Sequence, residues 1–448
     1  MKKWLNKIEW GLLWVLPVVV FFSYLPVIKL GANETMNFEL SLPLIWLAIF
    51  GILSLRKIRV IWKKLGKYAM AWLLFVIFAT ISVIWSLNLL RGILTDGIGW
   101  LILLSVLNII YCIRPTLKQS KKLLNIHVYA GVAAGILCLM QCFLDVFGID
   151  RTATGLCVGC TYQAIGFPHP NGLAIEPQFM GNLLILPALL SLLFLYDNIK
   201  NNKNNYKIGA SLALTFFLIM VLFITFSRGA IYSFMLGVIC LIAYACVKLH
   251  KFSTLWALPL IVAAFCGGLL CQGLLAQLSP TNENFQQGIT RSIEQMSLGI
   301  IDFKEEIVAD SNFNGYIEES TEIRLSLNEA ALTAWKIRPI FGVGLGGAGT
   351  AIHSIEPSLS SKEIIQNELF QILLELGVVG VGFVIILLIA TIRTAAKNKT
   401  KSLACFVCLL IMYGASMMFF SGLPNVLHIY LMTPVAYLLF KQYSYAKI

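Results

Sequence analysis

Long apolar runs decide the fold, and residues 368–391, ELFQILLELGVVGVGFVIILLIAT, are a typical one. Only Glu368 and Glu375 carry charge within this run, and it exceeds the roughly 20 residues that a helix needs to cross the hydrocarbon core of a bilayer. Similar runs recur along the chain of 448 residues, of which 58% are hydrophobic and 12% are charged. Soluble domains have about twice that charged fraction. The sequence therefore predicts a membrane protein.

We expect twelve membrane-spanning helices, so the predicted fold class is an all-α polytopic membrane protein. The spans lie near residues 10–28, 40–55, 68–86, 92–113, 123–147, 172–196, 208–226, 229–247, 253–275, 368–391, 402–420 and 427–440. The first run is too long for the apolar region of a cleaved signal peptide, and no small-residue cleavage site follows it. We therefore expect it to remain as the first span.

The positive charges predict the orientation of these helices. Most of the 34 Lys and Arg lie at the two termini and in alternate loops, whereas of the 22 acidic residues only Glu9 and Asp197 fall on that side. Cytoplasmic loops of membrane proteins carry an excess of Lys and Arg. Both termini are therefore expected in the cytoplasm, and the net charge of +12 needs no nucleic-acid partner.

One exterior loop, residues 277–367, is much longer than the others and divides the chain into spans 1–9 (1–276), the loop, and spans 10–12 (368–448). Apolar residues at steps of three and four between Phe285 and Ile307 predict an amphipathic helix. Such a helix lies on the membrane surface or packs on the bundle, with or without a ligand contact. A second helix is expected near 321–337, with Ile323, Leu327, Ala331 and Trp335 on one side and its end at Pro339.

The second loop helix leads into a glycine-rich stretch, RPIFGVGLGGAGT at 338–350, in which Gly344, Gly346 and Gly349 spell G-x-G-x-x-G. A dinucleotide site needs a preceding strand and a βαβ unit, neither of which is expected here, and no Gly-Lys-Ser/Thr follows. We therefore predict no nucleotide site. Two roles stay open: unshielded N–H groups that bind a phosphate of another kind, or a hinge that folds the loop helix over a groove.

Three short motifs lie where exterior segments meet the helices. They are Ser-Arg-Gly at 227–229, Arg324 and Trp335 separated by ten residues, and Asn367, Glu375, Gly377 and Gly380 at the tenth span. In their order and their placement relative to the spans, these motifs resemble the O-antigen ligase and O-antigen polymerase family of membrane glycosyltransferases. The stretch GFPHPNGLAIEP at 166–177 is similar to the family's exterior segment before the sixth span.

The resemblance implies a C-type glycosyltransferase architecture and a site on the outer face of the bacterial cytoplasmic membrane. The implied reaction moves a glycan from undecaprenyl-pyrophosphate to an acceptor hydroxyl, with inversion at the anomeric carbon and without a metal or other cofactor. The acceptor is the lipid A core in ligases and another carrier-linked repeat in polymerases. The expected partners are therefore a lipid-linked glycan, a glycan or lipid acceptor and the bilayer, with no nucleotide or nucleic acid.

Arg228 and Arg324 match the functional arginines of the family. Two fixed guanidinium groups can stabilise a departing pyrophosphate through bidentate hydrogen bonds, although Arg228 taken alone also fits an interfacial residue whose charge reaches water. The predicted catalytic residues are Arg228, Arg324, Gln366 and Asn367. The predicted substrate-binding residues are His169, Asn171, Glu176, Trp335, Gly344, Gly346, His353, Glu368 and Glu375.

One position departs from the family pattern. Ligases usually carry a His directly before the Asn of the third motif, and Gln366 stands there in this chain. An amide cannot act as a general base, so either acceptor activation is dispensable or another residue supplies it. The nearby groups are His353, Glu363 and Glu368, with His169 and Glu176 from the other exterior segment. Because of this departure, two alternative functions stay open: a polymerase, and a ligase-like enzyme with another acceptor.

Metal binding has little support in the sequence. Cys157, Cys160 and His169 have a spacing seen in zinc sites, but no fourth ligand is at hand. An incidental or disulfide-forming pair of cysteines is the favoured reading, and we predict no metal.

Two other classes of function stay open. A transporter or channel would use the exterior loop as a gate, and a non-catalytic assembly partner would only hold the carrier lipid. Transporters place ionisable groups near the middle of the membrane, whereas the polar groups of this chain cluster at one face. This distribution favours chemistry at the surface over passage through the membrane.

Overall fold

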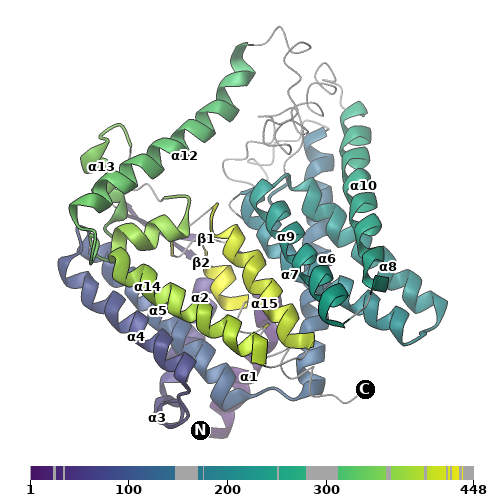
Figure 1. Ribbon diagram of the computed structural model, residues 1–448, viewed down its shortest axis with the longest axis horizontal. Helices are drawn as coiled ribbons and strands as arrows, with labels where there is room; N and C mark the ends of the chain where they lie inside the picture. The colour runs from purple at the N-terminus through teal and green to yellow at the C-terminus, as the bar shows by residue number, and fades with distance from the viewer. Residues whose placement is uncertain are drawn as a thin grey trace. The chain divides into compact units, whose positions relative to one another are not determined.

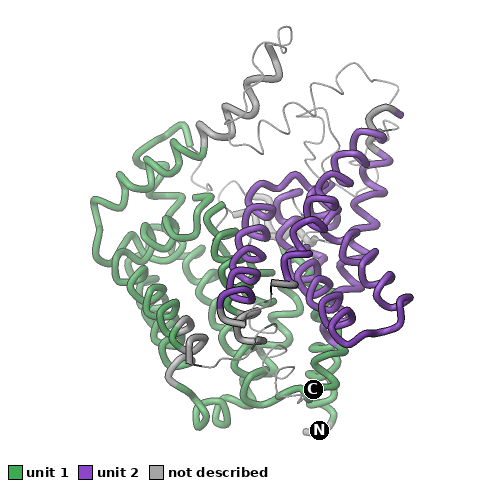
Figure 2. Tube along the Cα trace, turned by 45° about the vertical axis from the view of Figure 1, so that its right-hand side comes forward, with its two compact units in different colours: residues 1–20, 27–122, 319–448 green, residues 21–26, 123–318 purple. Residues whose placement is uncertain are grey.

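The computed structural model describes residues 2–23, 27–33, 36–146, 170–174, 176–249, 252–278, 311–359, 365–397, 401–419, 422–423, 426–432 and 436. These residues are mainly helical, with one two-stranded antiparallel hairpin, as Figure 1 shows. The chain forms two compact units, coloured separately in Figure 2. Unit 1 comprises residues 1–20, 27–122 and 319–448, and unit 2 comprises residues 21–26 and 123–318.

Unit 1 contains the helices of both chain ends and the hairpin. Its elements are α1 (Lys2–Val19), β1 (Val27–Asn33), β2 (Met36–Ser41), α2 (Leu42–Leu55), α3 (Ile58–Lys63), α4 (Lys67–Ser82), η1 (Val83–Trp85), α5 (Leu89–Asn108), η2 (Ile109–Ile113), α13 (Ala348–Ile355), α14 (Glu368–Lys397) and α15 (Lys401–Ser416). It also holds the start of α6 (Leu117–Val146) and most of α12 (Ser311–Ile337). Within unit 1, α5 packs against α2 and α4, and α14 packs against α4 and α15.

Unit 2 is built around a buried helix. Its elements are the remainder of α6, α7 (Pro177–Lys200), α8 (Asn205–Ile224), α9 (Arg228–Leu249), η3 (Phe252–Trp256) and α10 (Ala257–Gln277). Helix α7 is buried along most of its length and packs against α8 and α9. A Cβ at Gly131 of α6 would lie 2.7 Å from Pro187 of α7. The glycine therefore allows these two helices to approach closely, as small residues do between membrane helices.

Seven of the described helices are long and apolar enough to cross a membrane. They are Leu89–Ile113, Leu117–Leu144, Pro177–Lys200, Asn205–Ile224, Arg228–Val247, Thr254–Leu275 and Glu368–Ala390. Three shorter apolar helices are Leu42–Leu55, Ala69–Trp85 and Val407–Ser416. The prediction of a helical, multi-pass membrane protein is confirmed, whereas the count of twelve spans and the C-type architecture stay predictions.

The N-terminal region differs from the sequence prediction. A span was expected at 10–28, but α1 runs from Lys2 to Val19 and the chain enters β1 at Val27. The hairpin register pairs Ile28 with Leu40, Lys29 with Glu39 and Leu30 with Phe38. Apolar residues thus stand opposite apolar ones and a cation opposite an acid, a pattern that favours strand pairing. The end of the first apolar run therefore belongs to a strand.

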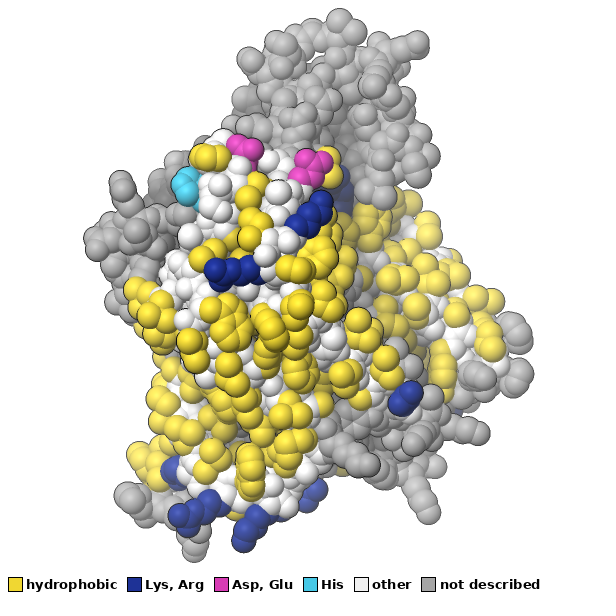
Figure 3. Space-filling model, turned by 60° about the vertical axis from the view of Figure 1, so that its left-hand side comes forward, with side chains coloured by type: hydrophobic (Ala, Val, Ile, Leu, Met, Phe, Trp, Pro, Cys, Tyr) yellow, Lys and Arg dark blue, Asp and Glu magenta, His cyan; other side chains and the backbone are white. Residues whose placement is uncertain are grey.

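The surface of unit 1 carries a band of hydrophobic side chains on the face drawn in Figure 3. Lys and Arg side chains gather below this band, and Asp, Glu and His side chains appear above it together with further Lys and Arg. Many of the exposed apolar side chains belong to α4, α5 and α14, including Leu74, Ile93 and Ile385. A belt of this kind is what a lipid-facing surface requires, because hydrocarbon does not solvate charge.

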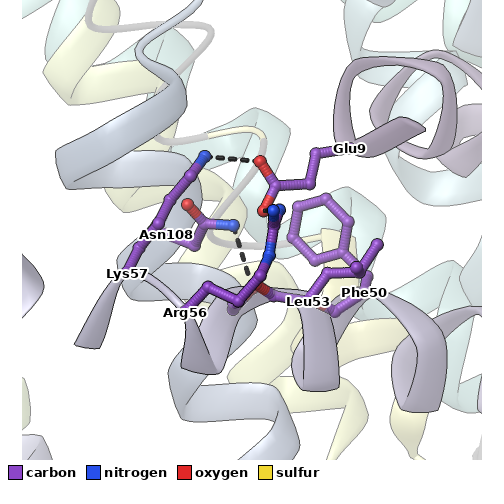
Figure 4. A network of polar contacts seen from close by, with 7 residues as sticks. Glu9, Phe50, Leu53, Arg56, Lys57 and Asn108 are labelled. Atoms are coloured by element: carbon purple, nitrogen blue, oxygen red, sulfur yellow. Dashed lines mark hydrogen bonds and ion pairs between the residues drawn. The ribbon is translucent and has the colours of Figure 1, made fainter. Parts of the chain in front are cut away.

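An ion-pair network fastens α1 to the end of α2, as Figure 4 shows. The side chain of Glu9 is only 1% exposed and forms ion pairs with Arg56, at 2.9 Å from Nη2, and with Lys57. Beside it, Asn108 of α5 donates from Nδ2 to the hydroxyl of Ser54 at 2.9 Å. The Trp46 indole also donates to the Leu12 carbonyl at 2.8 Å. Three helices of unit 1 are therefore joined by polar contacts near one end.

Replacing Glu9 by Gln should lower the thermal stability of the protein. The variant leaves two cations without their shared acid, and breaking a fully buried pair costs about 3–5 kcal/mol. The expected loss is smaller, about 1–3 kcal/mol, because the side chains of Arg56 and Lys57 are 31% and 21% exposed and can reach water. Thermal unfolding in detergent measures it. Lys57→Gln is the control and should cost less, because Arg56 still pairs with Glu9; equal melting of Glu9→Gln and wild type would contradict the prediction.

Candidate functional site

Helix α14 is interrupted at Gly377, where φ is 65° and ψ is −165°. The glycine-rich stretch fills the interruption; we call residues 338–347 the glycine turn. Its Val343 and Gly344 N–H groups donate to the carbonyls of Leu374 and Glu375, both at 2.9 Å. In return, the N–H groups of Val378 and Val379 donate to the carbonyls of Pro339 and Ile340, at 3.0 and 3.3 Å. The turn thus replaces the helical hydrogen bonds that the break removes.

The other side of the glycine turn rests on the connection between η1 and α5. Ser86 donates from its hydroxyl to the Leu345 carbonyl at 2.7 Å, and the Leu345 N–H donates to the hydroxyl of Ser82 at 3.2 Å. The Leu87 N–H donates to the Val343 carbonyl at 3.3 Å. The turn is therefore held between two membrane-associated segments of unit 1.

The spacing of the glycines follows from this packing. Gly342, Gly344 and Gly346 have φ angles of 68°, 88° and 79°, in the left-handed region that side chains disfavour. A Cβ at each of them would overlap backbone atoms, namely those of Glu375 for Gly342, Ser86 for Gly344 and Gly92 for Gly346. The G-x-G-x-G pattern is thus accounted for by close contact between backbones.

The same contacts bear on whether the turn binds a phosphate. The N–H groups of residues 342–345 and 347 all donate within unit 1, since Gly342 bonds to the Arg338 carbonyl at 2.9 Å and Gly347 to the Gly344 carbonyl at 3.0 Å. Donors that are already engaged do not offer the cradle of free N–H groups that anion binding needs. Of the two roles left open by the sequence, the geometry favours a connection between α12 and α14 over a cradle formed by Gly344 and Gly346.

Helix α12 carries Arg324 and Trp335 and leads directly into the glycine turn. It begins at Ser311, ten residues before the expected start, while the amphipathic helix expected between Phe285 and Ile307 lies outside the described residues. Arg324 is half-buried. The Trp335 indole donates to the Pro339 carbonyl at 3.0 Å, which fixes the bend between helix and turn.

An apolar cluster joins the second half of α12 to α13 and α14. Its buried members are Leu327, Ala330, Ala331, Ala334, Val343, Ala348, Ala351, Ile352, Ile365 and Leu374, with Trp335, Ile355, Leu359 and Phe370 packed against it. The expected apolar side of this helix is confirmed at Leu327, Ala331 and Trp335, and its contact is with protein. The helix bearing Arg324 is therefore held against the segment that begins α14.

The two predicted catalytic residues just before α14 have different surroundings. The buried Asn367 accepts hydrogen bonds at Oδ1 from the N–H groups of Leu369 and Phe370, at 3.0 and 3.2 Å, as the N-cap of α14. Its neighbour Gln366 is exposed, and the described residues give its amide no hydrogen-bond partner. Gln366 is thus the residue of this motif with a side chain available to a ligand.

Three other predicted site residues of unit 1 already have protein partners. Glu368 accepts from the Gly422 N–H at 2.7 Å and from the Tyr430 hydroxyl at 3.2 Å. The buried Glu375 accepts from the Gln371 amide at 2.6 Å. His353, exposed on α13, has its Nδ1 2.6 Å from the Leu359 carbonyl oxygen. These contacts give each side chain a role in holding unit 1 together.

In unit 2, Arg228 is the first residue of α9. The preceding Phe226 has a φ of 48°, and Ser227 accepts at its hydroxyl from the Ala230 N–H at 3.3 Å. Gly181 of α7 lies against this joint, since a Cβ there would be 2.8 Å from Ser227. The half-buried Arg228 forms no ion pair or hydrogen bond through its guanidinium with the described residues. The joint is therefore closely packed, and no acid of the described residues forms an ion pair with its cation.

The segment before α7 is clamped by a glutamine of α6. The Gln141 amide donates to the Gly172 carbonyl at 2.9 Å and accepts from the Gly172 N–H at 2.8 Å. The buried Asn171 donates to the Ala174 carbonyl at 2.8 Å, and Glu176 is exposed just before α7. Asn171 thus stabilises the segment itself. His169, Glu363, Cys157 and Cys160 lie outside the described residues.

Residues 213–385 match the family model described as O-antigen ligase. This segment belongs to the O-antigen ligase family. It contains Arg228, the whole of α12, the glycine turn and α14 as far as residue 385, so the predicted family is confirmed. A comparison of the chain with curated proteins finds no match. The matched segment of this multi-pass membrane protein is thus of O-antigen ligase type, a family whose substrates are lipid-linked glycans.

Within unit 1, the apolar cluster packs Trp335 and Val343 of the glycine turn together with Ile365, the residue directly before Gln366. Arg228 belongs to unit 2 and Arg324 belongs to unit 1. Their joint action on one substrate stays a prediction. Among the described residues, no three His, Cys, Asp or Glu side chains gather as a metal site would require.

Several polar residues that shape the family segment and its surroundings were missed in the sequence. Ser82 and Ser86 hold the glycine turn, Gln141 clamps Gly172, and Gln371 binds Glu375. Gln141 and Gln371 gave a usable signal, because an amide within an apolar span requires a hydrogen-bond partner. The two serines gave none, because serine hydroxyls commonly bond to their own helix.

Gly377→Ala should destabilise the folded protein strongly. Its conformation is almost confined to glycine and costs other residues about 1–3 kcal/mol, and the added Cβ would overlap the Ile340 carbonyl. The matched control is Gly382→Ala in the same helix, where a Cβ meets no atom within 4 Å, so it should be neutral or stabilising by up to ~1 kcal/mol. Melting temperature and monodispersity in detergent distinguish the two; indistinguishable values would show that the break is not needed.

Proposed function

We propose that this chain transfers a glycan from undecaprenyl-pyrophosphate to an acceptor hydroxyl at the outer face of the cytoplasmic membrane, in the manner of an O-antigen ligase. The observation that carries the proposal is Arg228, a half-buried cation at a helix start within the family segment, without an acidic partner among the described residues. A positive charge at a helix N-terminus opposes the helix dipole. A bound anion removes this conflict, and the pyrophosphate of a carrier lipid is such an anion.

The proposed chemistry is a direct displacement. The acceptor oxygen attacks the anomeric carbon while the bond from that carbon to the pyrophosphate oxygen breaks, so the configuration inverts and the carrier pyrophosphate leaves. Negative charge builds up on the leaving group, and Arg228 and Arg324 stabilise it by charge-assisted hydrogen bonds. In this proposal the two guanidinium groups supply the charge that a metal ion supplies in other glycosyltransferases.

We assign Gln366 the role of binding the acceptor. Its exposed amide has no partner among the described residues and can accept a hydrogen bond from a sugar hydroxyl, thereby orienting it. It cannot remove the proton as a base. The same residue favours the second candidate function, a repeat-unit polymerase, because ligases of the family usually have a His at this position. We place residues 277–367 and this site on the outer side of the cytoplasmic membrane, and both termini in the cytoplasm.

The decisive experiment incubates the pure protein with a defined undecaprenyl-pyrophosphate oligosaccharide and candidate acceptors, and reads the products by mass spectrometry. Arg228→Lys and Arg324→Lys should each lower kcat by about 10²–10³-fold, because a single ammonium does not replace a bidentate guanidinium. Arg393→Lys, at an exposed position near the other end of α14, is the control and should transfer normally. A wild-type rate in Arg228→Ala would overturn the proposal, as would solute transport in liposomes without any change in the lipid-linked glycan.

Gln366→His provides a separate test of the acceptor role. The variant places a titratable group with an ordinary pKa near 6.5 at the acceptor. Only neutral imidazole accepts a proton, so activity of the variant should fall as the pH drops through about 6.5, whereas Gln366 adds no such step to the wild type. The pH profiles of kcat for the two proteins measure this difference. Superimposable profiles would show that residue 366 does not touch the acceptor.

A further inference from the structure

A chain of hydrogen bonds runs from the glycine turn to the backbone just before Gln366. The Gly344 N–H of the turn donates to the backbone carbonyl of Glu375, at 2.9 Å. Glu375 accepts at Oε1 from Nε2 of Gln371, at 2.6 Å. Gln371 in turn accepts at Oε1 from the Ile365 N–H, at 3.3 Å. The glycine turn, helix α14 and the segment before it are thus linked in one series.

The direction of each bond in this series is fixed by chemistry. The Ile365 N–H only donates, so the Gln371 oxygen must face Ile365 and its NH₂ group must face the Glu375 carboxylate. The opposite orientation of the Gln371 amide would place donor against donor and acceptor against acceptor. The side chains of Gln371 and Glu375 are 5% and 6% exposed, so water cannot readily replace a lost partner.

One end of the series connects to the helix that carries Arg324, and the other end lies next to Gln366. At one end, the glycine turn continues from α12, which carries Arg324. At the other end, Ile365 is fully buried in the apolar cluster while the next residue, Gln366, points outward. A hydrogen bond that holds the Ile365 N–H therefore also fixes the direction in which the Gln366 side chain projects from the surface.

We propose that Gln371 and Glu375 are positioning residues, which hold the backbone at Ile365 so that the Gln366 amide faces the acceptor. Both act without touching the substrate, so the role expected for Glu375 from the sequence, direct substrate binding, is replaced. The inference rests on the proposed function, because it assigns Gln366 to the acceptor side of a transfer reaction.

Gln371→Met removes both hydrogen bonds and keeps the length of the side chain. The Ile365 N–H should become unprotected, and hydrogen–deuterium exchange of the peptide containing residues 365–367 should rise. Because the donor pyrophosphate is held by arginines, donor affinity should stay unchanged. The acceptor KM should rise, and kcat should fall by about 10–100-fold, as expected for a misplaced but intact group.

An exchange of the two side chains gives the matched test. Gln371→Glu alone sets two carboxylates against each other, and Glu375→Gln alone replaces the carboxylate that accepts from Gln371 by an amide that brings a second NH₂ group to the same buried place. The double variant Gln371→Glu/Glu375→Gln has the same composition and net charge as wild type and can form both side-chain hydrogen bonds again. We therefore expect both single variants to lose transfer activity and the double variant to regain most of it, with wild-type exchange at residues 365–367.

Each outcome decides the proposal. Recovery in the double variant supports it, since a general loss of stability in the singles would not be reversed by a second polar substitution in the membrane. Losses that simply add in the double variant, or faster exchange with unchanged acceptor KM and kcat, would overturn it. Absence of transfer by the wild-type protein would overturn the proposed function with it, and the exchange data would then report on the hydrogen bonds alone.

Discussion

The break in α14 at Gly377 is the constraint on which the rest of unit 1 depends. A membrane helix that stops and restarts leaves peptide groups without partners, and each such group costs several kcal/mol in a medium without water. The glycine turn supplies four replacement hydrogen bonds, two in each direction. The need to satisfy these groups positions the turn, and through it the bend after Trp335 and the end of α12. The placement of α12, which carries Arg324, therefore depends on these backbone hydrogen bonds together with the apolar cluster.

The polar residues of the family segment divide into those with protein partners and those without. Glu368, Glu375 and Asn367 are bonded within unit 1. Glu368 accepts from the Gly422 N–H, Glu375 accepts from Gln371 of the same helix, and Asn367 caps α14. Arg228 and Gln366 are left without such bonds among the described residues. The acids thus shape the scaffold, while the half-buried cation of Arg228 and the exposed amide of Gln366 are available to a ligand. This division fits a site that receives an anionic lipid carrier and a hydroxylated acceptor.

Much of the fold could be predicted because membrane insertion depends on local composition. The apolar runs at 92–113, 208–226 and 368–391 each correspond to a helix of suitable length. The predicted end of the first span at residue 28 was wrong, because α1 ends at Val19 and residues 27–33 pair as a strand with residues 36–41. Strand pairing joins separate segments, and no pattern within one apolar run reports it. The break at Gly377 was hidden for the same reason, because a single glycine in an apolar span also fits a continuous helix.

The sequence by itself determined that the protein is helical and membrane-embedded, and its motifs indicated the O-antigen ligase family. Those properties follow from hydrophobicity and from residue types at set spacings, which are local quantities. Only the tertiary structure decided what the individual polar residues do. The glycines close a broken helix, Asn367 caps α14, and Gln371 links Glu375 to Ile365. A hydrogen bond needs both of its partners within about 3 Å, and the sequence alone does not specify which distant groups the fold brings that close.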